Sequence, residues 1–283
     1  MSNDDHDLGF AHDLPRMLKR RHFLAALGGI GMISATTPAS AALQCVALPW
    51  ETAGPYPADA SNTRDGQVVN VLTQQGVIRE DLRTSFGDYT GTAEGVRLDL
   101  TLTLVNADGC TPLAGRALYL WACDAEGSYS LYDTPSANYM RGVGIADPNG
   151  VIKFTTIFPA CYAGRWPHFH FEIFENAEAA VSGEASLLTA QIALPEADCV
   201  AVYEQDERYR NSSRNLGRVT LDRDMVFRDN SEAQLEQQML ALNGSPASGY
   251  AGTLTIPVDF TAEKRVERAP PPGAPGRQPE QEQ

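Results

Sequence analysis

The stretch that decides the fold is residues 96–104, VRLDLTLTL. Valine and leucine occupy every second position from Val96 to Leu104, and the positions between them carry Arg, Asp and Thr. Because successive side chains of a β-strand point to opposite faces of its sheet, this period of two predicts a strand with one buried face. The core of the protein is therefore expected to form against the leucine face of this strand.

Short apolar stretches of the same kind recur later in the chain. They predict five further strands, at residues 117–121, 151–157, 168–173, 189–194 and 253–260. Turn-forming pairs separate several of them: Asp108-Gly109 precedes the first, and Asn149-Gly150, typical of a β-hairpin, precedes the second. Many short strands separated by turns favour an all-β fold, a two-sheet antiparallel β-sandwich.

The chain divides into four predicted segments. They are an export signal at residues 1–41, an irregular segment at 42–95 that wraps the core, the β-sandwich domain at 96–265, and a disordered proline-rich tail at 266–283. One short helix is expected within the sandwich domain, at about residues 232–242, with Asn230 or Ser231 as its N-cap.

The N-terminal segment has the three parts of an export signal. Lys19, Arg20 and Arg21 form a basic cluster, an apolar stretch follows at 25–35, and Ala39-Ser40-Ala41 supplies a small-residue cleavage site. The paired arginines favour the twin-arginine route, which carries folded proteins. The apolar stretch is too short to span a bilayer, so a periplasmic or extracellular protein is predicted.

The composition is acidic, with a formal net charge of −14 at pH 7 over 283 residues. Such a surface repels phosphate backbones and anionic lipid headgroups, although it is also the charge of an ordinary soluble surface. Nucleic acid and membranes are therefore poor candidate partners.

Five cysteines follow the predicted cleavage site: Cys45, Cys110, Cys123, Cys161 and Cys199. In an oxidising compartment they can pair, and spacing alone does not determine which pairs form. The preferred pairs are Cys110 with Cys123, expected on neighbouring strands, and Cys161 with Cys199, which leaves Cys45 over. No two cysteines have the CxxC spacing of a zinc site.

Two histidines remain after the predicted cleavage, His168 and His170, since His6, His12 and His22 lie in the segment expected to be removed. A spacing of two on a predicted strand points both imidazoles to the same face. Two imidazoles side by side form half of a metal site, although such a pair on an exposed strand is often inert. Further ligands would have to come from other segments.

Motifs on both sides of these histidines resemble a known family. The matching pieces are ETAGPY at 51–56, WACDAEGSYS at 121–130, Arg141-Gly142, TTIFP at 155–159, Tyr162, and RWPHFH at 165–170. In order and spacing they resemble the intradiol ring-cleavage dioxygenases, the family of protocatechuate and catechol dioxygenases. The resemblance covers about residues 45–175 and fades beyond residue 200.

The resemblance implies a mononuclear non-haem iron(III) site. Its ligands would be Tyr129 and Tyr162, as tyrosinates, and the imidazoles of His168 and His170. This donor set suits the ion, because a hard ferric cation favours anionic oxygen and lowers the pKa of a coordinating phenol far below its usual value of about 10. Zinc or copper would more often take a third histidine or a thiolate.

The resemblance also implies the reaction. The family cleaves the ring of an aromatic ortho-diol with O2 between the two hydroxyl-bearing carbons, giving a cis,cis-muconate-type product. Tyr162 would be the ligand that the diol displaces, taking up one of its protons, and Arg165 would stabilise negative charge that develops on the substrate. The expected partners are a small aromatic diol and O2.

Two features depart from the family pattern. Only residues 163–167 separate Tyr162 from His168, where many members have a longer excursion, and Ala122 stands where His or Gln is common. Both are expected to reshape the substrate pocket, so the substrate could be catechol, protocatechuate, hydroxyquinol or a lignin-derived diol.

Two other functions are alternatives: an exported, non-catalytic β-sandwich binding module, and a copper or zinc protein that uses the two histidines.

Overall fold

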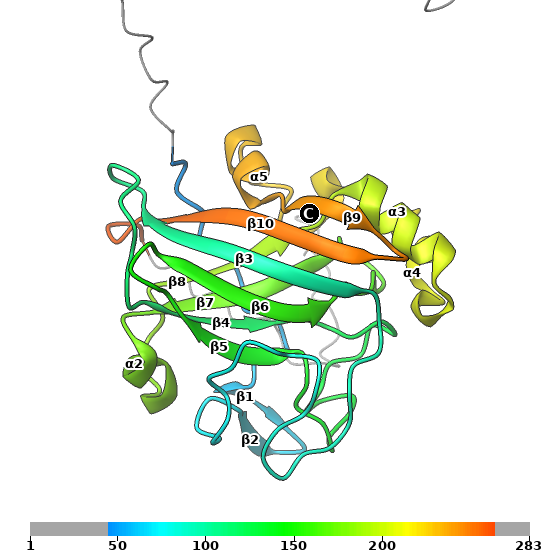
Figure 1. Cartoon of the computed structure of the whole chain (residues 1–283), viewed down its shortest axis with the longest axis horizontal. Helices are drawn as coiled ribbons and strands as arrows, with labels where there is room; N and C mark the ends of the chain where they lie inside the picture. Colours follow the sequence, from blue (N-terminus) through cyan, green and yellow to red (C-terminus); the bar gives the residue numbers. More distant parts are fainter. Residues whose placement is uncertain (1–44, 264–283) are drawn as a thin grey trace, which may run out of the picture. The chain divides into compact units, whose positions relative to one another are not determined.

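The computed structural model describes residues 45–263, so the predicted signal at 1–41 and the predicted tail at 266–283 lie outside the described residues. Within that range, two four-stranded sheets have the strand orders β6-β3-β10-β9 and β5-β4-β7-β8, and β1 and β2 form a small third sheet. The two larger sheets form the two layers of a β-sandwich (Figure 1). This confirms the predicted fold class. The strand bounds are β1 Asp59–Arg64, β2 Gln67–Asn70, β3 Arg97–Asn106, β4 Ala117–Trp121, β5 Arg141–Ile145, β6 Val151–Ile157, β7 His168–Phe174, β8 Leu188–Ala193, β9 Ala241–Ser245 and β10 Gly249–Val258.

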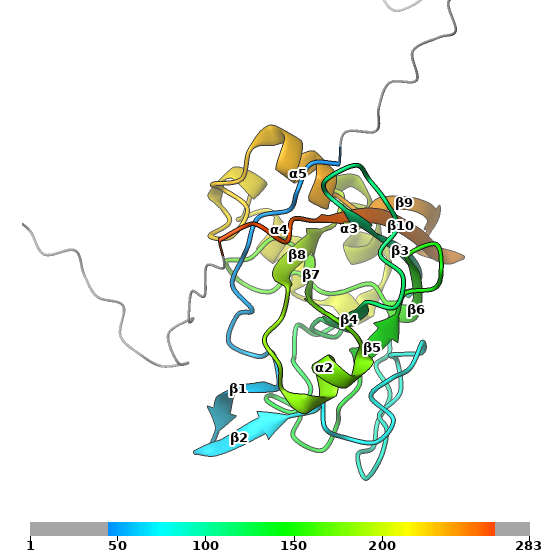
Figure 2. The same ribbon diagram turned by 90° about the vertical axis from the view of Figure 1, so that its left-hand side faces the viewer.

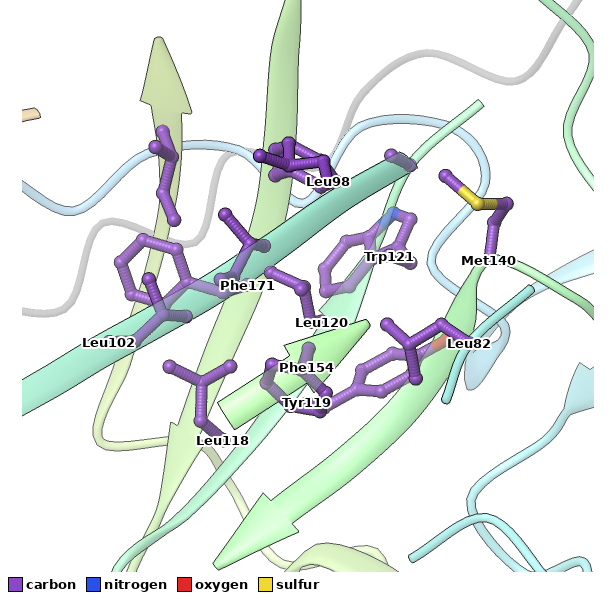
Figure 3. Close-up of a cluster of buried hydrophobic side chains, with 14 of the residues drawn as sticks. Leu82, Leu98, Leu102, Leu118, Tyr119, Leu120, Trp121, Met140, Phe154 and Phe171 are labelled. Atoms are coloured by element: carbon purple, nitrogen blue, oxygen red, sulfur yellow. The ribbon is translucent and has the colours of Figure 1, made fainter. Parts of the chain in front are cut away.

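The leucine face of β3 lies in the core, as its alternation predicts. Leu98 and Leu102 are fully buried, and the polar residues between the leucines are half-buried. Figure 3 shows these two side chains gathered with Leu118 and Leu120 of β4 and Phe171 of β7, which belong to the other sheet. Burying a side chain of this size contributes roughly 1.5–3 kcal/mol, so this contact between the two layers is a main source of stability.

The predicted helix is present, and other short helices accompany it. It is α5, Glu232–Gln238, capped by Ser231 in a capping box with Gln234. It ends before the predicted residue 242 because Ala241–Ser245 pairs with β10 as strand β9. Short helices that the sequence pattern did not indicate are α2 Ala177–Ser182, α3 Glu196–Gln205 and α4 Ser212–Leu216, with 3-10 turns at Glu207–Tyr209 and Leu221–Arg223. Among residues 45–263, no helix is long and apolar enough to cross a membrane.

One pair of strands runs parallel. β10 lies beside β3 in parallel register, from Tyr250 opposite Leu98 to Val258 opposite Asn106. The other paired strands of the three sheets are antiparallel. A period of two is the same in parallel and antiparallel strands, so the sequence pattern predicted the strands but not this direction.

The Asn149-Gly150 turn does not close a hairpin. The strands on its two sides, β5 and β6, belong to different sheets, so the turn carries the chain from one layer of the sandwich to the other. Gly150 has a φ of +78°, and a Cβ atom there would lie 2.4 Å from the carbonyl oxygen of Leu104. The pair therefore forms a tight turn of the expected kind, with a different topological role.

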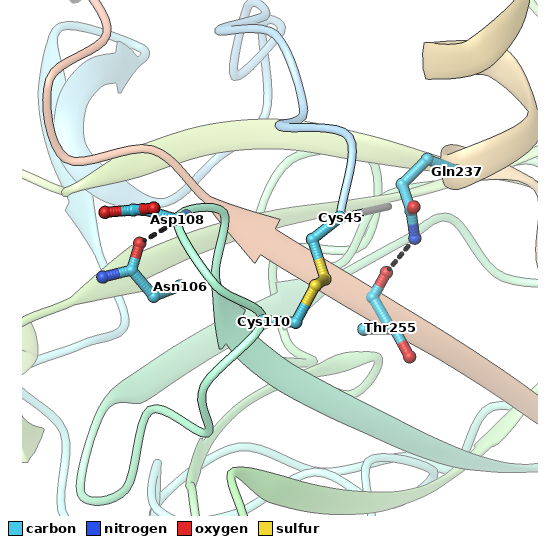
Figure 4. Close-up of a disulfide and its surroundings, with 6 residues drawn as sticks. All are labelled: Cys45, Asn106, Asp108, Cys110, Gln237 and Thr255. Carbon is cyan, nitrogen blue, oxygen red and sulfur yellow. Dashed lines mark hydrogen bonds between the residues drawn. A yellow bond between two sulfur atoms is a disulfide. The ribbon is translucent and has the colours of Figure 1, made fainter. Parts of the chain in front are cut away.

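The disulfide differs from both predicted pairs. Cys45 is bonded to Cys110, and Cys123, Cys161 and Cys199 are free and buried (Figure 4). Cys110 lies in the connection between β3 and β4, and these strands are in opposite sheets rather than beside each other. The predicted Cys110–Cys123 pair was therefore wrong because its premise of neighbouring strands was wrong.

Strand β7 is covered on both faces. Every one of its residues is buried. Phe169 and Phe171 alternate with His168 and His170, so one face is apolar and the other carries the imidazoles.

The chain from residue 45 to 58, blue in Figure 2, runs from beside α5 past β8 to β1. The main-chain amide of Glu51 donates to the carbonyl of Thr189 in β8. The irregular N-terminal segment thus lies against the sheet that carries the histidines.

Candidate metal centre

Strand β7 places both histidines on one face, as their spacing predicts. Each imidazole is only 2% exposed, and the two Nε2 atoms lie 3.0 Å apart. The ring of His170 stacks on Trp121 with an interplanar angle of 4°. Gly54 of the N-terminal segment packs against the same ring, and a Cβ at its φ of +74° would lie 3.1 Å from the His170 Cε1 atom. These contacts hold the imidazole in one orientation.

The two tyrosines come from separate loops. Tyr129 follows β4 in a turn that Asp124 organises by accepting the amides of Glu126 and Ser128, and the Tyr129 amide donates to Asp133. Tyr162 follows β6, in the connection that leads to β7. The two connections present both phenols to the histidine face of β7.

The four side chains meet at one point. The Tyr129 oxygen is 3.2 Å from His170 Nε2, and the Tyr162 oxygen is 3.2 Å from His168 Nε2. The two phenol oxygens are 3.4 Å apart. With the 3.0 Å between the imidazole nitrogens, these distances make a closed ring of four donor atoms. Donors bound about 2 Å from a single ion lie roughly 3 Å from one another, so the four atoms are spaced as the ligands of one metal would be.

The tautomer of His168 is determined by its neighbour. Its Nδ1 is hydrogen-bonded to the carbonyl oxygen of Trp166. Since a carbonyl can only accept, Nδ1 carries the proton, and the lone pair of Nε2 points toward the other three donors. The Nδ1 atom of His170 is buried and has no hydrogen-bond partner among the described residues.

Burial determines the charge of the four groups. It lowers the pKa of His168 to about 3 and the pKa of His170 well below its ordinary value. It raises the pKa of Tyr162 to about 12 and that of Tyr129 well above its ordinary value. The imidazoles are thus neutral and ready to coordinate, and a cation among the donors would favour the phenolate form of both tyrosines.

Arg165 lies beside this cluster. It is 8% exposed. Burial has the larger effect on the pKa of its neighbours, and the charge of Arg165 adds to the lowering of both histidine pKa values. The same charge partly offsets the rise that burial causes in the pKa of Tyr162. Its Nε donates to Asp224 over 2.9 Å, and its Nη2 donates to Gln191 over 2.6 Å. A fixed positive charge next to the donors favours an anionic substrate at the same place.

Two polar residues of this region were missed by the sequence analysis. Gln191 lies in β8 and is fully buried, and Asp224 follows the 3-10 turn Leu221–Arg223 and is also fully buried. Gln191 stands alone among apolar neighbours in a predicted strand, which was a usable signal of a polar interior position. Asp224 lies in an irregular stretch with no pattern that distinguishes it.

The N-terminal segment contributes to the same network. Glu51 accepts the amide of Gln191 over 2.8 Å and the side-chain amides of Asn230 and Gln238 over 2.8 and 2.9 Å. The side chain of Gln191 also donates to the carbonyl of Thr52. The segment that precedes the sandwich thus forms part of the wall around the cluster.

The donor set is specific to phenols and imidazoles. Within residues 45–263, no group of three or more His, Cys, Asp or Glu side chains is arranged to hold a metal ion. The two oxygens that complete the ring come from tyrosines, and hard phenolate oxygen suits a ferric ion. The residues present therefore fit the iron site that the resemblance implies.

A protein-family model matches the part of the chain that contains most of this site. Residues 73–169 match the family model described as Dioxygenase, a range that includes Tyr129, Tyr162 and His168 and ends just before His170. A search of curated proteins found no match.

The fold is shared with solved dioxygenase structures. An intradiol ring-cleavage dioxygenase from Tetranychus urticae is 22% identical, with a TM-score of 0.56 over 78% of this chain and 98% of that one. The dioxygenase domain of a carbohydrate-binding fusion protein from Streptomyces sp. SirexAA-E is 20% identical, with a TM-score of 0.42 over 71% and 97%. Catechol 1,2-dioxygenase from Pseudomonas arvilla C-1 is 18% identical, with a TM-score of 0.41 over 69% and 62%. The TM-score of 0.56 to the Tetranychus urticae structure shows that the fold is shared, and the function is inferred from the site.

Proposed function

We propose that this chain is an intradiol ring-cleavage dioxygenase. It would bind one iron(III) through Tyr129, Tyr162, His168 and His170 and use O2 to cleave an aromatic ortho-diol between its hydroxyl-bearing carbons. The observation that carries the proposal is the closed ring of two phenol oxygens and two imidazole nitrogens, 3.0–3.4 Å apart. The match of residues 73–169 to a dioxygenase family model supports it.

Tyr162 is the residue suited to leave the centre when substrate arrives. It is only partly buried, whereas Tyr129 is 3% exposed. Its surroundings raise its pKa to about 12, so a free phenolate at this position is a strong base. We assign to its oxygen the uptake of one proton from the incoming diol.

Arg165 provides the positive charge at the site. Its Nε and Nη2 atoms are engaged by Asp224 and Gln191, and no acceptor within residues 45–263 binds Nη1. That nitrogen is free to donate to an oxygen of the diol, and a charge-assisted bond of this kind strengthens as negative charge develops. Bound iron(III) would supply the electron withdrawal that makes the ring react with O2.

We further propose that the protein acts outside the cytoplasm. The basic, apolar and small-residue parts of residues 19–41 support export by the twin-arginine route. The Cys45–Cys110 disulfide supports an oxidising compartment, where such bonds persist.

The test is a metal analysis followed by an oxygen-uptake assay. Purified protein loaded with iron should hold about one iron per chain and be red-brown, since tyrosinate bound to iron(III) absorbs visible light. Addition of catechol, protocatechuate, hydroxyquinol or a lignin-derived diol should start uptake of one O2 per ring-opened product. A colourless protein with its full iron content would contradict the ligand assignment. A protein that binds no iron would favour a non-catalytic module, and tight binding of zinc or copper would favour the other alternative.

A further inference from the structure

Asp224 is a fully buried carboxylate in a part of the chain with little regular structure. Its Oδ2 accepts two bonds, from Arg165 Nε over 2.9 Å and from the amide of Trp166 over 2.7 Å. Its Oδ1 accepts the amides of Val226 over 2.8 Å and Phe227 over 3.3 Å. Burial would raise the pKa of Asp224, but Arg165 and these amides hold it below its usual value. The side chain is therefore an ionised anchor with all of its acceptor positions engaged.

The anchor fixes the plane of the Arg165 guanidinium. Asp224 binds Nε and Gln191 binds Nη2. Gln191 is itself held through its main-chain amide by Glu51 and through its side chain by the Thr52 carbonyl. Because a guanidinium is planar, fixing two of its nitrogens determines the direction of the third. The remaining nitrogen, Nη1, is the one without an acceptor among the described residues.

Asp224 also touches the chain beside the histidines. The Trp166 amide that it accepts belongs to the residue whose carbonyl receives the Nδ1 proton of His168. One carboxylate therefore holds both the charged residue and the main chain that sets the orientation of one imidazole. A carboxylate whose only purpose was to cap the turn at Val226 and Phe227 would need neither contact.

We infer that Asp224 is a positioning residue that aims Arg165 Nη1 at the anionic oxygens of a bound ortho-diol. The inference rests on the proposed function and adds a residue from outside the stretch that matches the dioxygenase model, residues 73–169. Asp224 would not touch the substrate. It would act through Arg165, by fixing where the positive charge lies before the diol binds.

The experiment is a double-mutant cycle in kcat/KM with iron-loaded protein and the diol that the wild type turns over. Asp224→Asn should lower kcat/KM about 10- to 100-fold while the iron content stays near one per chain. Asn has no charge and only one acceptor oxygen, so its NH2 group must face either Arg165 Nε and the Trp166 amide or the Val226 and Phe227 amides. In the Arg165→Ala background, Asp224→Asn should change kcat/KM less than about 2-fold, since the group that it positions is gone.

A matched control separates positioning from folding. Asp206 also accepts a main-chain amide, that of Arg208, and pairs with an arginine side chain, but its partner is not Arg165. Asp206→Asn should have the same small effect in both backgrounds. The melting temperatures of the metal-free proteins give a second double-mutant cycle that does not depend on activity. Asp224→Asn should lower the melting temperature less in the Arg165→Ala background than in the wild type, because the two side chains are directly paired.

The possible results are distinguishable. An Asp224→Asn variant with wild-type kcat/KM, or with the same fold-loss in both Arg165 backgrounds, would overturn the inference and leave Asp224 as a turn cap. The inference would also be overturned if the effects of the two substitutions depended on each other in the melting temperature but not in kcat/KM. If Asp224→Asn does not fold, Asp224→Glu keeps the charge and moves it by one methylene, and the same cycle applies. Failure of wild-type protein to cleave any diol would instead overturn the proposed function.

Discussion

The phenol oxygens of Tyr129 and Tyr162 lie 3.4 Å apart, yet only one of the two side chains is sealed from solvent. Tyr129 is 3% exposed, and its ring packs 5.0 Å from that of Tyr56 in the N-terminal segment. Tyr162 is only partly buried. The two phenols hold equivalent places in the ring of donor atoms but differ in their exposure to solvent.

This difference predicts unequal effects when each tyrosine is changed to phenylalanine. Tyr162→Phe should keep iron close to one per chain but lower kcat on the order of 100-fold, because the variant loses the oxygen that takes the proton of the diol. Tyr129→Phe should lose most of its iron, because it removes a ligand from the enclosed side of the cluster. Metal analysis and oxygen uptake on the same samples give both quantities. Equal losses of iron and of turnover in Tyr162→Phe would show that the displaceable ligand is misassigned.

Arg165 should act on the rate and not on metal retention. Arg165→Ala is expected to lower kcat about 10²- to 10³-fold with the iron content unchanged, because it removes a preorganised charge that faces the substrate. The variant also leaves the buried Asp224 carboxylate without its partner, so a lower melting temperature is expected, and assays belong well below it. Arg165→Lys is the control, since it keeps the charge but not the planar set of donors of a guanidinium. Its kcat should lie between those of the wild type and Arg165→Ala. Wild-type kcat in Arg165→Ala would remove the proposed role.

The strands were predictable because their signal is local. Alternation over a few residues marks β3 and β7 without any knowledge of their partners. The direction of β10 beside β3 and the passage of the chain between sheets at Asn149-Gly150 depend on which strands pair, and no local pattern encodes that. The Cys45–Cys110 bond belongs to the same class, since it joins segments 65 residues apart.

The candidate site also contains residues that local sequence predicts and residues that it does not. The two imidazoles follow from a spacing of two on a strand, and the tyrosines and Arg165 came from motif spacing in residues 121–170. Gln191 and Asp224 bind Arg165 across 26 and 59 residues. Their contacts arise only after β8 and the turn near residue 224 have packed against β7. The sequence around Gln191 signals a polar side chain in the interior but does not give its partner, and the sequence around Asp224 signals neither.

The Cys45–Cys110 bond should contribute to stability through the loop that it closes. A separation of 65 residues predicts a loss of about 2–4 kcal/mol in the free energy of unfolding for Cys45→Ser. Urea unfolding with and without dithiothreitol measures it. The reductant should destabilise the wild type and leave Cys45→Ser unchanged, which also controls for the three buried thiols. A wild type and variant with the same midpoint under oxidising conditions would show that the bond adds nothing.

Glu51 should make folding stability depend on pH. Burial raises its pKa to about 7 from 4.5, even though Gln238, Asn230 and the Gln191 amide donate to it. The folded state then binds a proton more tightly than the unfolded state does. The contribution of Glu51 to stability is present in full below about pH 4.5, declines as the pH rises, and is lost above about pH 7. A shift of this size corresponds to about 3 kcal/mol between those limits.

Glu51→Gln removes this titration and leaves a neutral side chain of the same shape. The variant should be destabilised relative to the wild type at pH 5, because its amide nitrogen faces the Gln191 amide that Glu51 accepts. The difference should shrink or reverse by pH 8, where the wild type carries a buried carboxylate. Urea unfolding of metal-free protein at both pH values measures the change. Glu94→Gln, at a side chain that is 77% exposed, is the control and should follow the wild type. Parallel pH profiles for wild type and Glu51→Gln would mean that the three N–H donors keep Glu51 ionised at pH 5, as carboxylates with several donors usually are.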